Sequence, residues 1–203
     1  LLMDSNSIIY DSLREISLGD YDNEELFERE LINRVYTKLR EYIKTISPLK
    51  VIYIAFDGVA PVAKMEQQRT RRYKSYLLTN IKERLEGIKT KTWDKCAITP
   101  GTKFMKNLGS TLKKKFKRSK KIILSTSDDA GEGEHKMFQY LRDNNMQDSN
   151  VVIYGLDADL IMLCLNHINL CKNIVLYRET PEFIKSINSD LEPNEAYVLD
   201  IKN

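Results

Sequence analysis

The sequence predicts an α/β domain whose central sheet is mostly parallel and has helices on both faces. Uninterrupted apolar runs at 51–56, 121–125 and 151–155 indicate strands that are buried on both faces. Apolar residues at helical spacing precede the first of these runs, at 23–46, and separate the last two, at 132–143. Strands that alternate with helices, without repeats or low-complexity tracts, are typical of a mostly parallel sheet.

The remaining predicted elements continue this alternation. Residues 1–4 are expected to end a first strand, and Ser5-Asn6-Ser7 to cap a helix whose apolar residues continue to Ile16. Pro61 is expected to begin a long basic helix that continues to about Gly87. Further elements are predicted as helices near 104–116 and 160–165, a strand at 174–177, and an element beginning within 195–201.

The length leaves room for one large domain or two small ones, and the distribution of charge indicates the type of ligand. The 203 residues can bury a real core, and the net charge of +3 is close to balance. Lysine and arginine gather at 64–74 and 113–121, whereas carboxylates stand at the predicted strand ends. This separation of charge suits a protein whose basic residues bind an anion and whose carboxylates bind divalent cations.

The cysteine count and the hydropathy indicate where the protein works. Three cysteines without a disulfide framework or paired metal spacing indicate an intracellular, reducing compartment, with the cytoplasm favoured over the nucleus. We expect no membrane partner, because no stretch is long and apolar enough to cross a bilayer. The sequence does not begin with Met, and we interpret it as a piece of a longer protein.

Six carboxylates follow four predicted strands. They are Asp4, Asp57, Glu132, Glu134, Asp157 and Asp159. Carboxyl ends of parallel strands meet at one edge of a sheet, where these side chains would repel one another. Hard divalent cations relieve such repulsion, Mg²⁺ most naturally and Mn²⁺ as a substitute, and two of them can support phosphodiester hydrolysis. The alternative, that each residue is an ordinary turn or cap former, is weakened because four strand ends share the pattern.

The helix after Pro61 carries a polar and basic stripe. Lys64, Gln68, Arg71 and Arg72 share one face, with Gln67 at its edge, so that periodicity leaves open which glutamine points inward. Lysine and arginine at this spacing could enclose a terminal phosphate beside the acidic residues. The alternative is a solvated basic face. The second basic run, at 113–118, is expected to be a solubilising surface that at best attracts nucleic acid non-specifically.

Several long segments resemble the Xrn family of 5′→3′ exoribonucleases. The matching segments are 56–61, 63–65, 67–72, 98–102 with 104–105, 131–136 and 154–163, and more loosely 4–9. They stand in the family's order and extend over nearly the whole chain.

The resemblance implies a PIN/FEN-like nuclease core that removes mononucleotides processively from single-stranded RNA with a 5′ monophosphate. It implies that all six carboxylates bind two Mg²⁺ ions and that the 5′ phosphate lies against the basic stripe, with Gln68 as the inward glutamine. Tyr10 stands where the family has a base-stacking His, and it can still stack. Residues 1–203 would then be a partial N-terminal exonuclease domain, truncated at both ends, which could be inactive as an isolated fragment. A further acidic ligand and a stacking Trp would lie beyond Asn203.

Two other functions stay open at this point. A related metal nuclease that acts on 5′ DNA ends or flaps would share the carboxylates, although no helix-hairpin-helix or arch pattern is present. A catalytically silent member could serve as an RNA-binding or assembly scaffold, although all six carboxylates argue against loss of activity.

Overall fold

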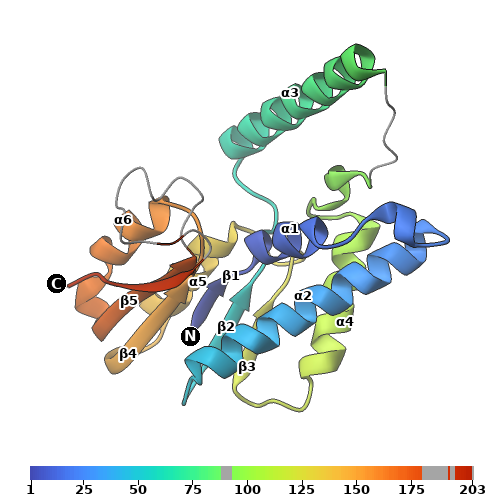
Figure 1. Ribbon diagram of the computed structural model, residues 1–203. Coiled ribbons are helices and arrows are strands. Elements are labelled where there is room, and N and C mark those ends of the chain that lie inside the picture. The colour runs from blue at the N-terminus through green and yellow to red at the C-terminus, as the bar shows by residue number, and fades with distance from the viewer. Residues whose placement is uncertain (88–92, 180–191, 193–194, 203) are drawn as a thin grey trace.

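A six-stranded sheet forms the centre of the molecule (Figure 1). The computed structural model describes residues 1–87, 93–179, 192 and 195–202. The strands are β1 (Leu2–Asp4), β2 (Ile52–Ala55), β3 (Ile122–Ser125), β4 (Met146–Tyr154), β5 (Cys171–Glu179) and β6 (Ala196–Asp200). Their order is β3-β2-β1-β4-β5-β6, and only β6 pairs antiparallel. The predicted α/β fold with a mostly parallel sheet is confirmed.

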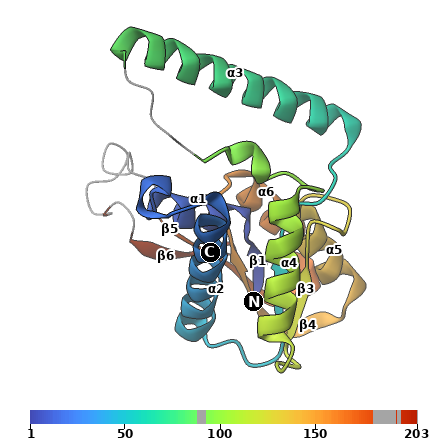
Figure 2. The same cartoon turned by 90° about the vertical axis from the view of Figure 1, so that its right-hand side faces the viewer.

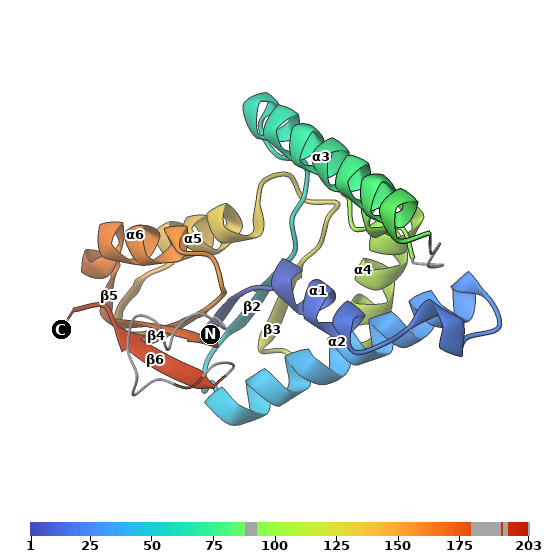
Figure 3. The same ribbon diagram turned by 45° about the horizontal axis from the view of Figure 1, so that its top comes forward.

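Helices cover both faces of the sheet. They are α1 (Asn6–Arg14), α2 (Glu24–Ile46), α3 (Val62–Glu86), α4 (Lys103–Phe116), α5 (Gly133–Asp143) and α6 (Asp159–Asn166), with short 3₁₀ turns at Leu18–Asp20, Lys95–Ala97 and Ile168–Leu170. α1, α2 and α4 lie on one side, and α5 and α6 on the other (Figure 3). Most of α3 projects away from this body (Figures 1 and 2). Among the described residues, no helix is long and apolar enough to span a membrane.

Each face of the sheet has its own apolar core. On the first face, the rings of Phe27 and Phe104 lie 5.7 Å and 4.9 Å from that of Trp93, and all three are buried. On the second face, Phe138 of α5 and Cys164 of α6 are buried against β4 and β5. Burial of apolar surface on both faces stabilises the sheet at roughly 25 cal/mol per Å².

Three elements differ from their predicted form. β4 and β5 are longer than the apolar runs that predicted them, because β4 also includes residues 146–150 and β5 also includes 171–173 and 178–179, most of which are polar. The register between these strands is irregular between Met146 and Asn150. Ser5 does not cap α1 with its side chain, because its hydroxyl donates to the Met3 carbonyl oxygen. The undetermined element near 195–201 is strand β6.

The pairing register aligns the carboxyl ends of four strands. Asp4 lies beside Ala55, Ala55 beside Ser125, and Met3 beside Tyr154. The loops that leave β1, β2, β3 and β4 therefore start from the same edge of the sheet. Ligand sites of open parallel sheets form at this edge.

Glycines allow two of these loops to approach closely. The Gly58 amide donates to the Gly131 carbonyl oxygen at 2.8 Å, and the Gly131 amide donates to the Val59 oxygen at 2.9 Å. A Cβ atom on Gly58 would lie only 1.7 Å from the Asp129 carbonyl oxygen. No side chain fits there unless the two loops separate.

We therefore expect Gly58→Ala to destabilise the fold by at least about 2 kcal/mol, as overpacking of rigid backbone does. Urea unfolding measures this loss of free energy. Gly19→Ala is the matched control, because its Cβ would have only an ordinary contact of 3.6 Å with the Ser17 hydroxyl oxygen. Equal stability of the two variants would show that the loops can separate without cost.

Candidate functional site

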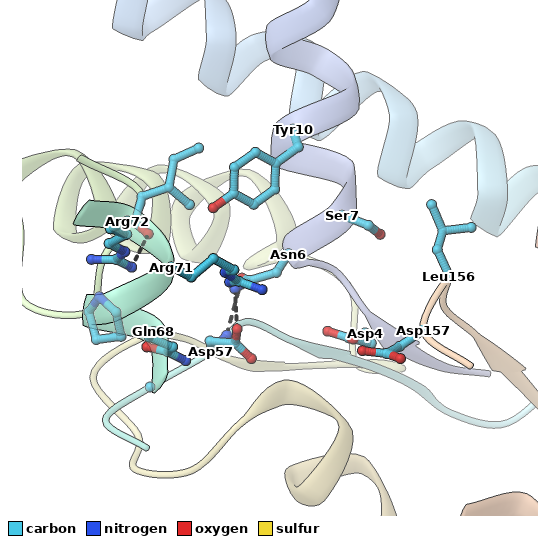
Figure 4. Close-up of a pocket in the computed structure, with 13 residues that line it drawn as sticks. Asp4, Asn6, Ser7, Tyr10, Asp57, Gln68, Arg71, Arg72, Leu156 and Asp157 are labelled. Carbon is cyan, nitrogen blue, oxygen red and sulfur yellow. Dashed lines mark hydrogen bonds between the residues drawn. The ribbon is translucent and has the colours of Figure 1, made fainter. Parts of the chain in front are cut away.

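A cavity of about 300 Å³ opens at the carboxyl edge of the sheet (Figure 4). Acidic residues from β1 and from the loops after β2 and β4 form one side, and residues of α3 form another. Its lining residues are Asp4, Asn6, Ser7, Tyr10, Asp57, Gly58, Gln68, Arg71, Arg72, Ile98, Pro100, Leu156 and Asp157. The cavity thus combines negative and positive side chains that are far apart in the sequence.

Asp4 is the most constrained acidic residue of the cavity. Its Oδ1 is buried and has no hydrogen-bond partner among the described residues. Burial, together with the negative charges of Asp57, Glu134 and Asp157, raises the pKa of Asp4 to about 7. A carboxylate in this position needs a compensating positive charge.

Asp57 is held by the start of two helices. The Asn6 side-chain amide donates to Asp57 Oδ2, and Asn6 Oδ1 accepts from the Asp57 backbone amide at 3.2 Å. The Gly133 amide, at the start of α5, donates to Asp57 Oδ1 at 2.7 Å. Burial raises the pKa of Asp57, and the hydrogen bond from Gly133 opposes that shift. The sequence predicted Asn6 only as part of the cap of α1, although its position two residues after Asp4, the end of a strand, was a usable signal.

Five of the six predicted carboxylates interact with one another. Glu134 has a raised pKa, caused first by burial and also by the charges of Asp157 and Glu132. Asp159 stands apart: it is exposed at the start of α6 and does not line the cavity. Its backbone amide donates to Asp157 Oδ1 at 3.2 Å. Asp157 thus lines the cavity, as its position at a strand end predicted, whereas Asp159 does not.

The acidic residues fit a divalent cation by their chemistry. The unpartnered Asp4 oxygen, close to three other carboxylates, is the kind of group that a hard cation satisfies. As the side chains stand, no group of three or more His, Cys, Asp or Glu residues in the described part of the chain could hold a metal ion. Asn6 and Gly133 donate to the two Asp57 oxygens, and Lys64 pairs with Glu132.

The basic stripe of α3 meets the cavity with three of its four predicted members. Gln68, Arg71 and Arg72 line it (Figure 4), whereas Gln67 is exposed and does not. This placement agrees with the choice of Gln68 over Gln67. Lys64 points instead to Glu132, with Nζ 2.9 Å from Oε2. This ion pair joins two residues that were predicted to contact phosphate and metal separately.

Arg72 of α3 and Tyr10 of α1 both line the cavity (Figure 4). The Arg72 guanidinium donates to the Thr99 hydroxyl and, at 3.4 Å, to the Ile98 carbonyl oxygen. These bonds tie α3 to the loop before α4. Arg71 is exposed and has no ion pair with another described residue, so it is the cation most available to a ligand.

Lys136 lies beside the site, and the sequence motifs indicated no separate role for it. It is only 8% exposed, and its Nζ donates to the Phe56 and Thr126 carbonyl oxygens, both at 2.9 Å. Burial lowers the pKa of Lys136, and the nearby charges of Asp129 and Asp57 oppose the shift. A lysine two residues after Glu134, in the first turns of the helix that follows β3, was the available signal. Its ammonium connects the ends of β2 and β3 beneath the acidic residues.

A parallel sheet with an acidic carboxyl edge and a flanking cationic helix places the chain in the class of PIN-like nuclease domains. The family model described as XRN 5'-3' exonuclease N-terminus matches residues 1–180. The chain therefore belongs to this family, and the resemblance inferred from the sequence motifs is confirmed.

Curated relatives agree with the family assignment. The chain is 38% identical over 189 residues to 5'-3' exoribonuclease 1 of Saccharomyces cerevisiae, a match that covers 82% of the chain and 12% of the relative. It is 40% identical over 169 residues to 5'-3' exoribonuclease 2 of Cryptococcus neoformans, which covers 68% of the chain and 15% of the relative. The chain thus spans a small part of the length of the relatives it matches.

Proposed function

We propose that this chain is the phosphate-binding and metal-binding part of a 5′→3′ exoribonuclease that degrades single-stranded RNA with a 5′ monophosphate. One observation carries the proposal: a single cavity is lined by Asp4, Asp57 and Asp157 on one side and by Gln68, Arg71 and Arg72 on the other. Hydrolysis of a phosphodiester next to a terminal phosphate needs acidic residues that hold a metal ion and basic residues that bind the phosphate. The names of the relatives support the direction of degradation.

In this proposal the carboxylates hold Mg²⁺, which Mn²⁺ can replace. Asp4 and Asp57 are the central ligands, with Asp157, Glu134 and Glu132 beside them, and Asp159 would join only after a change of its turn. Bound Mg²⁺ would supply an activated water and stabilise the leaving oxygen. The protein's own contribution is to fix Asp57 through Asn6 and Gly133, so that this ligand keeps its place without substrate.

The basic residues select the RNA end. Arg71 offers a planar fork of donors for a phosphate, and Gln68 adds an uncharged donor. Arg72 is fixed by Thr99 and Ile98 and thus shapes the wall of the cavity. A cavity of about 300 Å³ has little space for a cap or a triphosphate. Tyr10 is available to stack on the first base. Lys64 would reach phosphate only by leaving Glu132.

The cysteines support a reducing compartment as part of this proposal. All three are free: Cys164 and Cys171 are buried, and Cys96 is exposed. Burial raises the pKa of Cys164 to about 12, which keeps this thiol protonated and unreactive.

Arg71→Ala in the full-length protein tests the proposal. We expect its preference for a 5′ phosphate over a 5′ hydroxyl to fall roughly ten- to a hundred-fold, because hydrogen bonds to charged groups contribute about 1.5–3 kcal/mol. Degradation of 5′-hydroxyl RNA should change little. The measurement compares rates of mononucleotide release from RNAs that differ only in the 5′ end.

Arg69→Ala is the control, because Arg69 is an exposed arginine of the same helix that does not line the cavity. An unchanged end preference in Arg71→Ala would place the phosphate pocket elsewhere. A parallel assay with flap DNA separates the alternative nuclease, which would cleave that substrate faster than the RNA. Absence of Mg²⁺-dependent release with RNA binding intact would indicate the catalytically silent scaffold.

A further inference from the structure

A second cavity lies at the opposite end of the sheet from the acidic site. It has a volume of about 660 Å³ and lies between the C-terminal half of α2, the last residue of α4 and the first residue of β3. Its lining residues are Tyr36, Thr37, Arg40, Glu41, Ile43, Lys44, Phe116 and Ile122. α2 and α4 run along the same face of the sheet (Figure 2). We refer to this cavity as the α2–α4 groove.

The floor of the α2–α4 groove is apolar and packs against the core of the first face. The rings of Tyr36 and Phe116 are 5.1 Å apart at an interplanar angle of 52°. These rings, with Ile43 and Ile122, pack against the core of the first face while remaining partly exposed. A partly exposed apolar floor can accept a large apolar side chain from outside.

Cations without acidic partners surround this floor. Lys115 Nζ lies 4.4 Å and Arg40 Cζ 5.8 Å from the centre of the Tyr36 ring, and Lys44 lines the groove beside them. Within the described part of the chain, none of these three cations forms an ion pair. Glu41 is the single acidic residue among the lining residues. The groove therefore carries a net positive charge.

Two other cations of α2 provide a contrast. Arg34 pairs with Glu15 and Glu30, and Lys38 pairs with Glu15 at 2.6 Å. Arg34 and Lys38 thus have acidic partners, whereas Arg40 and Lys44 at the groove form no ion pair with another described residue. An acidic ligand would pair with Arg40 and Lys44 as Glu15 pairs with Arg34 and Lys38 in the middle of the helix.

We propose that the α2–α4 groove binds a short acidic segment of a partner protein that inserts a leucine- or phenylalanine-sized side chain onto the apolar floor. Charge complementarity and the apolar floor together define this ligand. RNA fits less well, because Phe116, Arg40 and Lys115 already contact the Tyr36 ring and leave it poorly open to a stacking base. The groove is remote from the acidic cavity, so the proposal does not depend on the proposed function.

Peptide binding to the full-length protein tests this proposal. The probe is a fluorescent peptide in which a central Leu-Phe pair is flanked by Glu and Asp, and anisotropy reports its affinity. We expect the double variant Arg40→Glu/Lys44→Glu to weaken binding by at least about tenfold, because each reversal turns an attraction into a repulsion. Replacing the Leu-Phe pair of the peptide by serines should weaken binding by a similar factor.

A matched double variant controls for the change in net charge. Arg29→Glu/Lys106→Glu alters exposed cations on the same two helices, at residues that do not line the groove, and should retain binding within about twofold. Thermal unfolding of both double variants verifies that each is folded. Equal loss of affinity in both would overturn the proposal in favour of non-specific attraction.

Two further outcomes would also overturn it. Unimpaired binding of the serine peptide would mean that the apolar floor takes no part. Displacement of the acidic peptide by a 5′-hydroxyl single-stranded RNA, with loss of RNA binding in Arg40→Glu/Lys44→Glu but not in Arg29→Glu/Lys106→Glu, would identify the groove as a nucleic-acid surface. The RNA ends in a hydroxyl so that the proposed phosphate pocket contributes nothing to this competition.

Discussion

Asparagine in place of Asp4 is expected to abolish nucleotide release while it makes the metal-free protein more stable around the site. Asp4 has a buried oxygen without a partner and faces the charges of Asp57, Glu134 and Asp157. Asparagine has nearly the same shape and no charge, so the repulsion disappears and its amide can donate to a neighbouring carboxylate. The same change removes a proposed Mg²⁺ ligand.

Stability and activity should therefore change in opposite directions. In EDTA, amide hydrogen exchange in β1 and β2 of the full-length protein should be roughly tenfold slower in Asp4→Asn, which corresponds to about 1.4 kcal/mol. Mg²⁺ should slow exchange in the unaltered protein and have little effect in the variant. Release of mononucleotides from 5′-monophosphate RNA should fall to background.

Asp148→Asn is the control for this substitution. Asp148 is exposed on β4, far from the carboxyl end of the strand, and does not line the cavity. We expect its exchange and its activity to match those of the unaltered protein. Faster exchange in Asp4→Asn would mean that the Asp4 carboxylate stabilises the metal-free fold, and our account of the acidic residues would be wrong.

The position of the acidic site could be predicted because backbone geometry determines it. Each buried strand is followed by a carboxylate, and a parallel sheet brings such strand ends to one edge whatever the side chains do. The length of β4 and β5 could not be predicted in the same way. Residues 147–150 and 172–173 are polar, and they belong to strands because β4 and β5 pair with each other, which is a tertiary effect.

Side-chain partners were beyond what periodicity can specify. Lys64 and Glu132 were assigned to phosphate and to metal, yet they form an ion pair because α3 passes beside the start of α5. Asp159 follows Asp157 by two residues, but only Asp157 lines the cavity, and the Asp159 backbone amide donates to its carboxylate at the start of α6. The basic run near residue 115 was expected to be a plain solvated surface, whereas Lys115 lies over the Tyr36 ring. Each of these contacts depends on the packing of helices that are distant in sequence.

Lys136→Met is expected to destabilise the ends of β2 and β3 by about 3 kcal/mol, because it leaves two buried carbonyl oxygens without donors. It also removes a positive charge that interacts with Asp57 and Asp129. Hydrogen exchange in β2 and β3 should therefore become more than about a hundred-fold faster. Lys113→Met is the control, because Lys113 is exposed and its 3.9 Å pair with exposed Asp128 contributes little.

Activity measurements separate a structural role of Lys136 from a catalytic one. Its Nζ lies beneath the loops, bonded to backbone, and the residue does not line the cavity. If Lys136 only supports the site, a stabilising osmolyte such as trimethylamine N-oxide should restore much of the activity of Lys136→Met, because it favours the folded state without replacing the ammonium. The same osmolyte cannot restore Asp4→Asn, which is folded but lacks a ligand. If the osmolyte returns the hydrogen exchange of Lys136→Met to normal but restores activity in neither variant, Lys136 takes a direct part in the reaction.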